Sequence, residues 1–302
     1  MEQITMEQVR EKAYAKVNLG LDVTGRREDG YHLVSMVMQT IGIHDDIVVY
    51  KTKDPNISLD IDYGGVHLAT PLSAGDDNLC ARAARVINER LGIGHGYFIH
   101  LTKSIPVAAG MAGGSSDAAA VLRAINRLED AGLTTEELQE LAVKIGADVP
   151  YCVVGGTMQA EGIGEKLSPL KPLTDVPLLV AKPPEGVSTA EVYHALDEQE
   201  TICHPDMKAV CEAVSNGDVD GLAKHMGNVL MDVTLPKYPV VGKIRDLMLE
   251  NGALGAMMTG SGPTVFGIYR TAQECQKAAE VVRAGGLCET VMATKTIADI
   301  TK

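Results

Sequence analysis

The sequence predicts a fold that mixes α-helices and β-strands, on three observations. Short runs rich in apolar and β-branched residues alternate along the chain with segments whose apolar residues recur every three or four positions. A composition of 45% hydrophobic and 22% charged residues excludes disorder, collagen and coiled coil. No fixed-period repeat or long linker interrupts the 302 residues, so one large domain or two modest ones are expected.

The elements follow from local patterns. A strand is expected around residues 13–21, where polar and apolar residues alternate. Six further strands are expected from short apolar runs, at 46–50, 57–61, 97–101, 178–181, 256–258 and 264–269. Four helices are expected at 79–91, 118–128, 134–145 and 272–282. The first is closed by Gly92 and the third opens with the capping box Thr134-x-x-Glu137.

Charge and composition limit the partners. With 27 Lys and Arg against 40 Asp and Glu, the net charge is −13 and no basic run is present, which argues against nucleic acid and anionic membranes. No apolar run is long enough to span a bilayer, and residues 1–5 lack the features of a signal peptide, so a cytoplasmic protein is expected. The six dispersed cysteines predict reduced thiols, and no protein-bound metal is expected.

The glycine-rich run at residues 106–117 carries the strongest functional signal. It joins an expected strand to a helix, and its glycines allow the backbone to approach a ligand while the helix start favours bound phosphate. Its spacing is not that of a Walker A loop, a dinucleotide fingerprint or a nucleophile elbow. A tight turn needed only for helix packing is the alternative, and the paired Ser115 and Ser116 favour phosphate.

Two further segments are ambiguous when taken alone. Lys16 and Asn18 lie on one face of the strand at 13–21, and a solvent-facing side is the simpler interpretation. Residues 258–264 form a second glycine cluster between two expected strands, for which a hairpin turn is the simpler interpretation.

The other two candidate segments are turns. Asp148 sits in an apolar turn after a helix, where it could cap the turn or act chemically. Tyr31 and His32 end a turn-rich loop, and their rings could stack on a base or pack on the core.

Taken together, these segments resemble the GHMP kinases over essentially the whole chain. The two glycine clusters are general to the superfamily. Residues 15–19, 29–32 and 146–150 resemble its branch that acts on a cytidine diphosphate-linked methylerythritol. The resemblance implies an α+β fold of two domains, a ribosomal protein S5 domain 2-like domain over 1–162 and a ferredoxin-like domain over 163–302. Dense prolines between Ser168 and Pro184 are compatible with a nearby boundary.

The resemblance also implies an activity and its residues. It implies transfer of the ATP γ-phosphoryl group, with Mg²⁺, to the 2-hydroxyl of 4-diphosphocytidyl-2-C-methyl-D-erythritol, with ATP and acceptor meeting between the domains. Asp148 would take the hydroxyl proton, and Lys16 would keep Asp148 ionised and stabilise charge. Nucleotide binding is implied at Asn78, Pro106, Gly110, Met111, Ala112, Gly113, Gly114, Ser115 and Ser116. Acceptor binding is implied at Asn18, Tyr31, His32, Asp148, Thr189, Tyr193, Gly260 and Ser261, with the cytosine between the two tyrosines.

Two alternatives stay open at the level of sequence. Another GHMP kinase, of the homoserine or mevalonate type, is opposed by Tyr31-His32 beside Lys16. A catalytically silent nucleotide-binding regulator is opposed by the presence of Lys16 and Asp148. No residue is assigned to the metal, and monomer and homodimer are both compatible with the sequence.

Overall fold

The computed structural model describes residues 7–66 and 71–301, so the prediction made on residues 1–5 lies outside it. The chain forms two compact units built from interleaved segments. Unit 1 holds the described residues up to Ala15, residues 43–107 and residues 112–154, and unit 2 holds residues 16–42, 108–111 and 155 onward. The two long strands β1 (Gln8–Arg26) and β2 (His32–Lys51) contribute to both units. The domain boundary at 162/163 stays a prediction.

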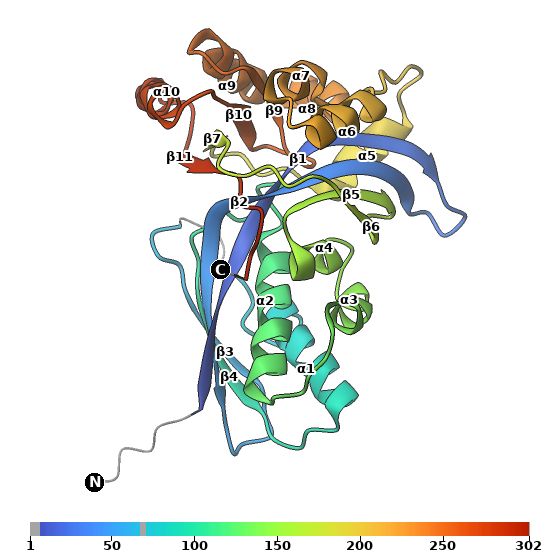
Figure 1. The fold of residues 1–302 in the computed structure, drawn as a ribbon, viewed down its shortest axis with the longest axis vertical. Coiled ribbons are helices and arrows are strands. Elements are labelled where there is room, and N and C mark those ends of the chain that lie inside the picture. Colours follow the sequence, from blue (N-terminus) through green and yellow to red (C-terminus); the bar gives the residue numbers. More distant parts are fainter. Residues whose placement is uncertain (1–6, 67–70, 302) are drawn as a thin grey trace. The chain divides into compact units, whose positions relative to one another are not determined.

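In unit 1, helices pack against strands on one side (Figure 1). Its further elements are β3 (Ser58–Asp62), α1 (Leu79–Leu91), β4 (Tyr97–Thr102), α2 (Gly113–Leu128), α3 (Thr135–Val143) and α4 (Val149–Val154). Strand β4 pairs parallel with β3 and antiparallel with β2, where Asp46 lies opposite Thr102. Helix α2 presents an alanine-rich buried face, which lets α1 and α4 pack closely on it.

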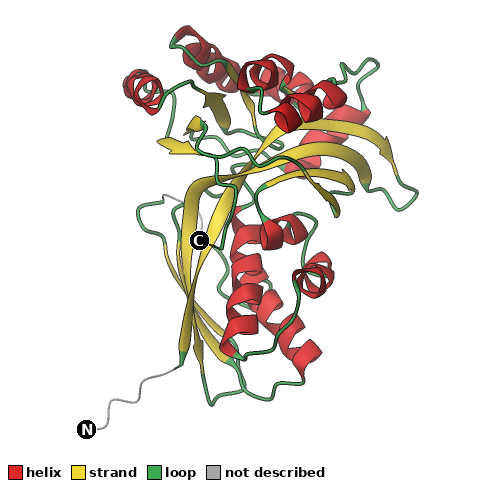
Figure 2. Ribbon diagram, in the orientation of Figure 1, coloured by secondary structure: helices red, strands yellow, loops and turns green. Residues whose placement is uncertain are grey.

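Unit 2 contains a four-stranded antiparallel sheet in the order β11-β7-β10-β9. Figure 2 draws the strands of the protein in yellow and its helices in red. Its sheet strands are β7 (Pro177–Lys182), β9 (Gly255–Met258), β10 (Val265–Ile268) and β11 (Thr290–Lys295). Its helices are α5 (Thr189–Asp197), α6 (Met207–Asn216), α7 (Val219–His225), α8 (Met231–Lys237), α9 (Pro239–Glu250) and α10 (Ala272–Ala284). Three short strands, β5 (Thr157–Gly162), β6 (Lys166–Pro169) and β8 (Gly227–Asn228), join the sheet of β1 and β2.

The structure confirms the mixture of helices and strands, the strand expected around 13–21, and each of the six further strands and four helices. The capping box of α3 is present, and α1 ends at Gly92 with a left-handed φ of 66°. Among the helices the boundaries differ most at α2, which begins at Gly113 and not at Ala118, because the glycine-serine segment already adopts helical geometry. Helix α3 ends at Val143 and not at 145, and the strand expected at 46–50 is the end of the 20-residue β2. All six cysteines are free thiols. Among the described residues, none of the helices is long and apolar enough to cross a membrane.

A buried ionic cluster holds the start of α2 in unit 1. The Lys103 ammonium donates to Asp117 at 2.8 Å and to Asp45, and all three side chains are buried. Asp45 also accepts from the Ile105 backbone N–H at 2.7 Å. Asp117 Oδ1, by contrast, has no hydrogen-bond partner among the described residues. The cluster ties α2 to β2 and to the chain after β4.

The cluster places two carboxyl groups beside one cation. Burial raises the pKa of Asp117 well above its usual value; the Lys103 charge opposes this shift, and the nearby Asp45 adds to it. The native state therefore holds the Asp117 proton more tightly than the unfolded chain does. Asp117 consequently contributes less stability as the pH rises above the unfolded-state pKa.

We expect Asp117→Asn to keep an acceptor for Lys103 while removing the acid that opposes folding at high pH. Its free energy of unfolding, relative to that of the wild type, should rise between about pH 5 and about pH 8. Lys103→Met should cost about 3–5 kcal/mol, because two carboxyl groups lose their buried partner. Urea denaturation at both pH values checks this. Equal losses for the two variants at the higher pH would contradict it.

Candidate active site

The first turn of α2 exposes backbone N–H groups at the glycine-rich run. Ala112 stands at the N-cap with a left-handed φ of 57°, and within the described chain no side chain caps the helix. Ser116 is the first residue to donate within the helix, to the Ala112 carbonyl at 2.9 Å. The N–H groups of residues 113–115 thus have no acceptor in the helix, an arrangement that binds anions.

The two serines of this run have different surroundings. The Ser116 hydroxyl is buried and donates to the Tyr14 carbonyl at 2.6 Å, so it fastens α2 to β1. Its backbone N–H is also occupied, as described above. Ser115 keeps a half-buried position in the first turn, and its N–H is one of the three that can face an anion.

Gly113 and Gly114 are glycines for different reasons. A Cβ at Gly113 would lie 3.2 Å from Ile105 and 3.4 Å from the Lys103 ammonium, so this position is packed against the ionic cluster. A Cβ at Gly114 would lie 3.5 Å from Leu79, which is ordinary contact. Gly114 therefore has room for a methyl group, whereas a methyl group at Gly113 would have to push its neighbours aside by a few tenths of an ångström.

Two other predicted residues of unit 1 have local structural contacts. The Asn78 side chain caps α1 by accepting from the Cys80 N–H at 2.9 Å, and it donates to the Ser73 carbonyl at 2.7 Å. Its amide oxygen and one of its two amide N–H groups are thus used by the loop before α1, and its contact with the nucleotide stays a prediction. Pro106 is buried in the turn that precedes the glycine run.

Asp148 lies directly before α4 and is half-buried. Its backbone carbonyl accepts the Cys152 N–H at 3.2 Å, so it takes part in the first turn of the helix, and capping by its side chain stays a prediction. The catalytic assignment of its carboxyl group stays a prediction.

In unit 2, Lys16 and Asn18 are buried, so the solvent-facing interpretation of this strand face is wrong. The two side chains are 4% and 0% exposed, because the 108–111 segment and the loop after β9 cover them. The Lys16 ammonium donates to Asn18 Oδ1 at 2.7 Å and to the Gly110 carbonyl at 3.2 Å. The Lys16 N–H also bonds the carbonyl of Met111 at 3.2 Å. A buried cation therefore lies against the glycine-rich backbone.

Asn18 joins Lys16 to the loop between β9 and β10. Its Oδ1 also accepts the Gly260 N–H at 3.1 Å, and its own N–H donates to the Thr259 hydroxyl at 3.0 Å. A Cβ at Gly110 would lie 2.3 Å from the Thr259 carbonyl, so only glycine fits there. The loop is the expected hairpin connection, since Met258 pairs with Val265. It is also part of the polar network around Lys16.

The structure brings together two predicted acceptor-binding residues. The hydroxyl groups of Thr189, the first residue of α5, and Ser261 lie 2.8 Å apart. Helix α5 is capped by Ser188, whose hydroxyl accepts the Glu191 N–H. A rigid helix start therefore holds Thr189 against the loop.

His32 is tied to the end of α5. Its Nε2 lies 2.7 Å from Asp197 Oδ1, and Arg26 pairs with the other oxygen of Asp197 at 3.1 Å. The hydrogen bond from His32, together with the charges of His32, Arg26 and His194, holds the pKa of Asp197 below its usual value, against the effect of burial. The ring orientation of His32 is thus set from α5.

The two tyrosines predicted to hold a base have different surroundings. Tyr193 packs on the His32 ring with centroids 4.7 Å apart and an interplanar angle of 42°. Tyr31 is 60% exposed at the end of a turn that contains Gly30 with a φ of 90°. Tyr31 therefore presents an accessible ring, and the sandwich with Tyr193 stays a prediction.

Two residues of these networks, Asp197 and Asn228, were not predicted from the sequence, and Thr259 was predicted only as part of the second glycine cluster. Thr259 is fully buried, and its hydroxyl accepts from Asn18. Asn228 donates to the carbonyl groups of Met258 and Gly260. Their partners lie far away in sequence, so no local spacing indicates them; a threonine directly before Gly-Ser-Gly was the one available signal.

Comparison with known proteins gives the family. Residues 78–156 match the model of the GHMP kinases N terminal domain, and residues 200–286 match that of the GHMP kinases C terminal. A 4-diphosphocytidyl-2-C-methyl-D-erythritol kinase of Lachnospira eligens is 46% identical over 96% of this chain and 99% of its own. One of Clostridium perfringens is 45% identical over 95% and 97%.

Two solved structures superpose equally well on this chain but differ in sequence identity to it. A 4-(cytidine 5'-diphospho)-2C-methyl-D-erythritol kinase superposes with a TM-score of 0.79 at 33% identity, covering 95% of this chain and 99% of that one. A homoserine kinase from Cytophaga hutchinsonii reaches the same TM-score at 18% identity, covering 99% and 98%, and so shows the fold alone. The chain therefore belongs to the GHMP kinase family and, within it, to the 4-diphosphocytidyl-2-C-methyl-D-erythritol kinases.

Proposed function

We propose that the protein transfers the γ-phosphoryl group of ATP to the 2-hydroxyl of 4-diphosphocytidyl-2-C-methyl-D-erythritol, a step of non-mevalonate isoprenoid biosynthesis in the cytoplasm. The observation that carries this proposal is the 46% identity over nearly the full length of a relative with this name. The N–H groups at the start of α2 and the buried cation Lys16 support it.

Unit 1 supplies groups suited to the nucleotide. Phosphoryl transfer depends on alignment and on neutralising charge, with little covalent help from the protein. The N–H groups of residues 113–115 and the helix dipole of α2 would bind phosphate oxygens. The loop before α1, fixed by Asn78, would contact adenine.

Mg²⁺ fits this arrangement as a companion of ATP. In the part of the chain that the structure describes, no group of three or more acidic, His or Cys side chains could hold a metal ion. When bound with ATP, the ion would neutralise charge on the phosphate oxygens. This chain's own contribution to charge neutralisation is backbone N–H groups and Lys16.

The remaining residues have roles toward the acceptor. Asp148 would accept the proton of the attacking hydroxyl, and Lys16 would stabilise the negative charge that develops during transfer. Asn18 and the pair Thr189–Ser261 would fix the acceptor through the loop after β9. Tyr31 would stack on the cytosine, with His32 reading the base edge.

A coupled assay of ADP release tests the function itself. The enzyme is supplied with ATP, Mg²⁺ and either the cytidylyl acceptor, homoserine or mevalonate. Turnover of the cytidylyl acceptor alone is expected. Preferred turnover of homoserine or mevalonate would replace the proposal with another GHMP kinase, and ATP binding without turnover of any acceptor would indicate a silent regulator.

Asp148→Asn should reduce turnover by about 10²- to 10⁴-fold, because the base is lost. ADP affinity, measured by calorimetry, should be unchanged, because the start of α2 is untouched. Asp60→Asn removes a surface carboxylate of β3 that pairs with His100, and it serves as the control with normal turnover. Near-normal turnover of Asp148→Asn would reject the assignment.

Gly114→Ala should separate stability from nucleotide binding. The site has room for the methyl group, and alanine favours the helix, so the melting temperature should hold or rise. The methyl would obstruct the approach of phosphate to an N–H group, a charged hydrogen bond worth about 1.5–3 kcal/mol, so ADP should bind about 10- to 150-fold more weakly. Gly94→Ala, in open space, is the control. Unchanged ADP affinity in Gly114→Ala would contradict the binding of phosphate at this turn.

Tyr31→Ala should weaken acceptor binding about 5- to 160-fold, since stacking of a base on one aromatic ring is worth about 1–3 kcal/mol. Tyr31→Phe keeps the flat ring and should bind the acceptor normally. ADP affinity should be the same in both variants. The measurement is the dissociation constant of the acceptor. Equal values for wild type and Tyr31→Ala would show that the cytosine does not stack on Tyr31.

A further inference from the structure

Asn228 is a buried amide whose two N–H donors and oxygen all bond backbone groups. Its Nδ2 donates to the carbonyl oxygens of Met258 at 2.9 Å and Gly260 at 2.8 Å. Its Oδ1 accepts the Leu230 N–H at 3.0 Å. The residue is 6% exposed. One side chain therefore fixes two points of the loop between β9 and β10.

The same loop is bonded from β1. Gly260 donates its N–H to Asn18 and accepts from Asn228 with its carbonyl, so the two amides hold one peptide segment from two sides. Asn18 in turn accepts from Lys16. Strand β8 carries Asn228 and pairs in parallel with β1, where Leu21 lies opposite Asn228. A continuous polar path thus runs from Asn228 through Gly260 and Asn18 to Lys16.

The loop between β9 and β10 needs hydrogen bonds from outside because its glycines can adopt many backbone conformations. Gly260 and Gly262 have left-handed φ values of 57° and 88°, a region that glycine enters without steric cost. Glycines have no side chains with which to hold this geometry, and the unrestrained backbone would lose order. The hydrogen bonds from Asn18, Asn228 and Thr189 supply the restraint.

We propose that Asn228 is a positioning residue for phosphoryl transfer: it sets the Thr259–Ser261 segment, and through Asn18 it sets the Lys16 ammonium. The proposal rests on the proposed function, in which Lys16 and Asn18 act at the acceptor. Asn228 itself does not touch substrate. Its effect on the reaction passes through the loop.

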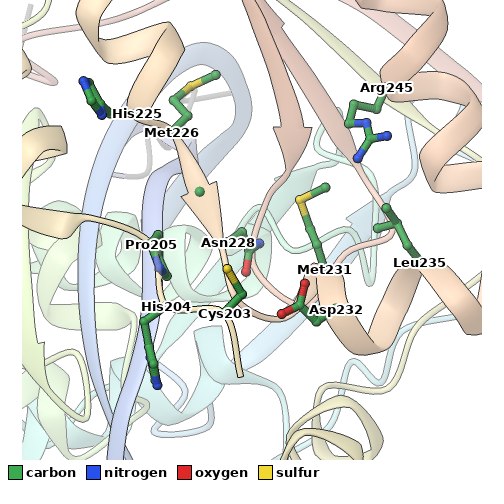
Figure 3. A pocket seen from close by; sticks show the side chains of 11 residues that line it. Cys203, His204, Pro205, His225, Met226, Asn228, Met231, Asp232, Leu235 and Arg245 are labelled. Atoms are coloured by element: carbon green, nitrogen blue, oxygen red, sulfur yellow. The ribbon is translucent and has the colours of Figure 1, made fainter. Parts of the chain in front are cut away.

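A cavity of about 300 Å³ lies next to Asn228, and it allows the role of this residue to be tested by substitution. Figure 3 shows Asn228 among the lining side chains, with Met231 and Asp232 nearby. The lining is partly polar, so water can enter. In Asn228→Ala, water from this cavity can reach the carbonyl oxygens of Met258 and Gly260. The variant should therefore fold, while the loop loses its rigid anchor.

The test compares Asn228→Ala with Val214→Ala, which removes buried methyl groups from α6 and matches a general loss of packing. Misplacement of reacting groups by about an ångström can cost on the order of 100-fold, so kcat/KM for the acceptor should fall about 10- to 100-fold in Asn228→Ala alone. ADP affinity should stay within about twofold in both variants. Amide exchange of the peptide covering residues 258–264, measured by mass spectrometry, should quicken in Asn228→Ala and not in Val214→Ala.

Asn228→Asp adds a pH readout that general destabilisation does not produce. An ionised carboxylate has no donor for the two carbonyl oxygens, whereas the protonated acid has one. The ratio of variant to wild-type kcat/KM should therefore rise as the pH falls from about 8.5 to about 6, since burial raises the pKa of the new acid. Wild-type kcat/KM and exchange rates in Asn228→Ala would overturn the proposal, as would an equal loss in Val214→Ala. If wild-type enzyme did not turn over the acceptor, the proposed function would fail, and the exchange rates would still test Asn228.

Discussion

The candidate site of unit 2 depends on the hydrogen bonds that the carboxamide of Asn18 makes. A single oxygen accepts from the Lys16 ammonium and the Gly260 N–H, while the backbone of the same residue bonds Thr259. A buried ammonium is costly unless its protons are bonded, and Asn18 Oδ1 and the Gly110 carbonyl each accept one here. These bonds fix the position from which the cation would act on an anionic phosphoryl group in the proposed chemistry.

Unit 1 contains a second buried lysine, Lys103, which pairs with carboxyl groups. The Lys103 ammonium lies between two carboxyl groups, and this cluster holds the first turn of α2 against the chain after β4. Its charge is compensated locally, so it is suited to support and not to ligand binding. Gly113 packs directly on this ammonium, whereas the N–H groups of the same turn remain for an anion.

The elements were predictable from sequence to the extent that their causes are local. The capping box of α3 and the terminal Gly92 of α1 lie within a few residues of the elements they bound, and both are confirmed. The start of α2 was misplaced because Gly-Gly-Ser-Ser has weak intrinsic helix propensity, and tertiary contacts of Ser116 and Asp117 outweigh it. The burial of Lys16 and Asn18 was not predictable from alternation, since their cover comes from a loop 241 residues away. Local pattern therefore predicts which residues share a strand face and does not show what packs upon it.

The glycine-rich segments are easy to find in the sequence, whereas the residues that hold them in place are not. The runs at 106–117 and 258–264 are conspicuous in sequence because glycine is needed where backbones approach each other, as Gly110 and Thr259 do. Such segments have few side chains of their own, so other parts of the chain must hold them in place. The anchors are ordinary residues in unremarkable contexts: Tyr14 and Lys103 for the first run, and Asn18 and Asn228 for the second. A glycine motif consequently indicates where a ligand can approach, whereas the precision of the site depends on distant polar side chains that no motif contains.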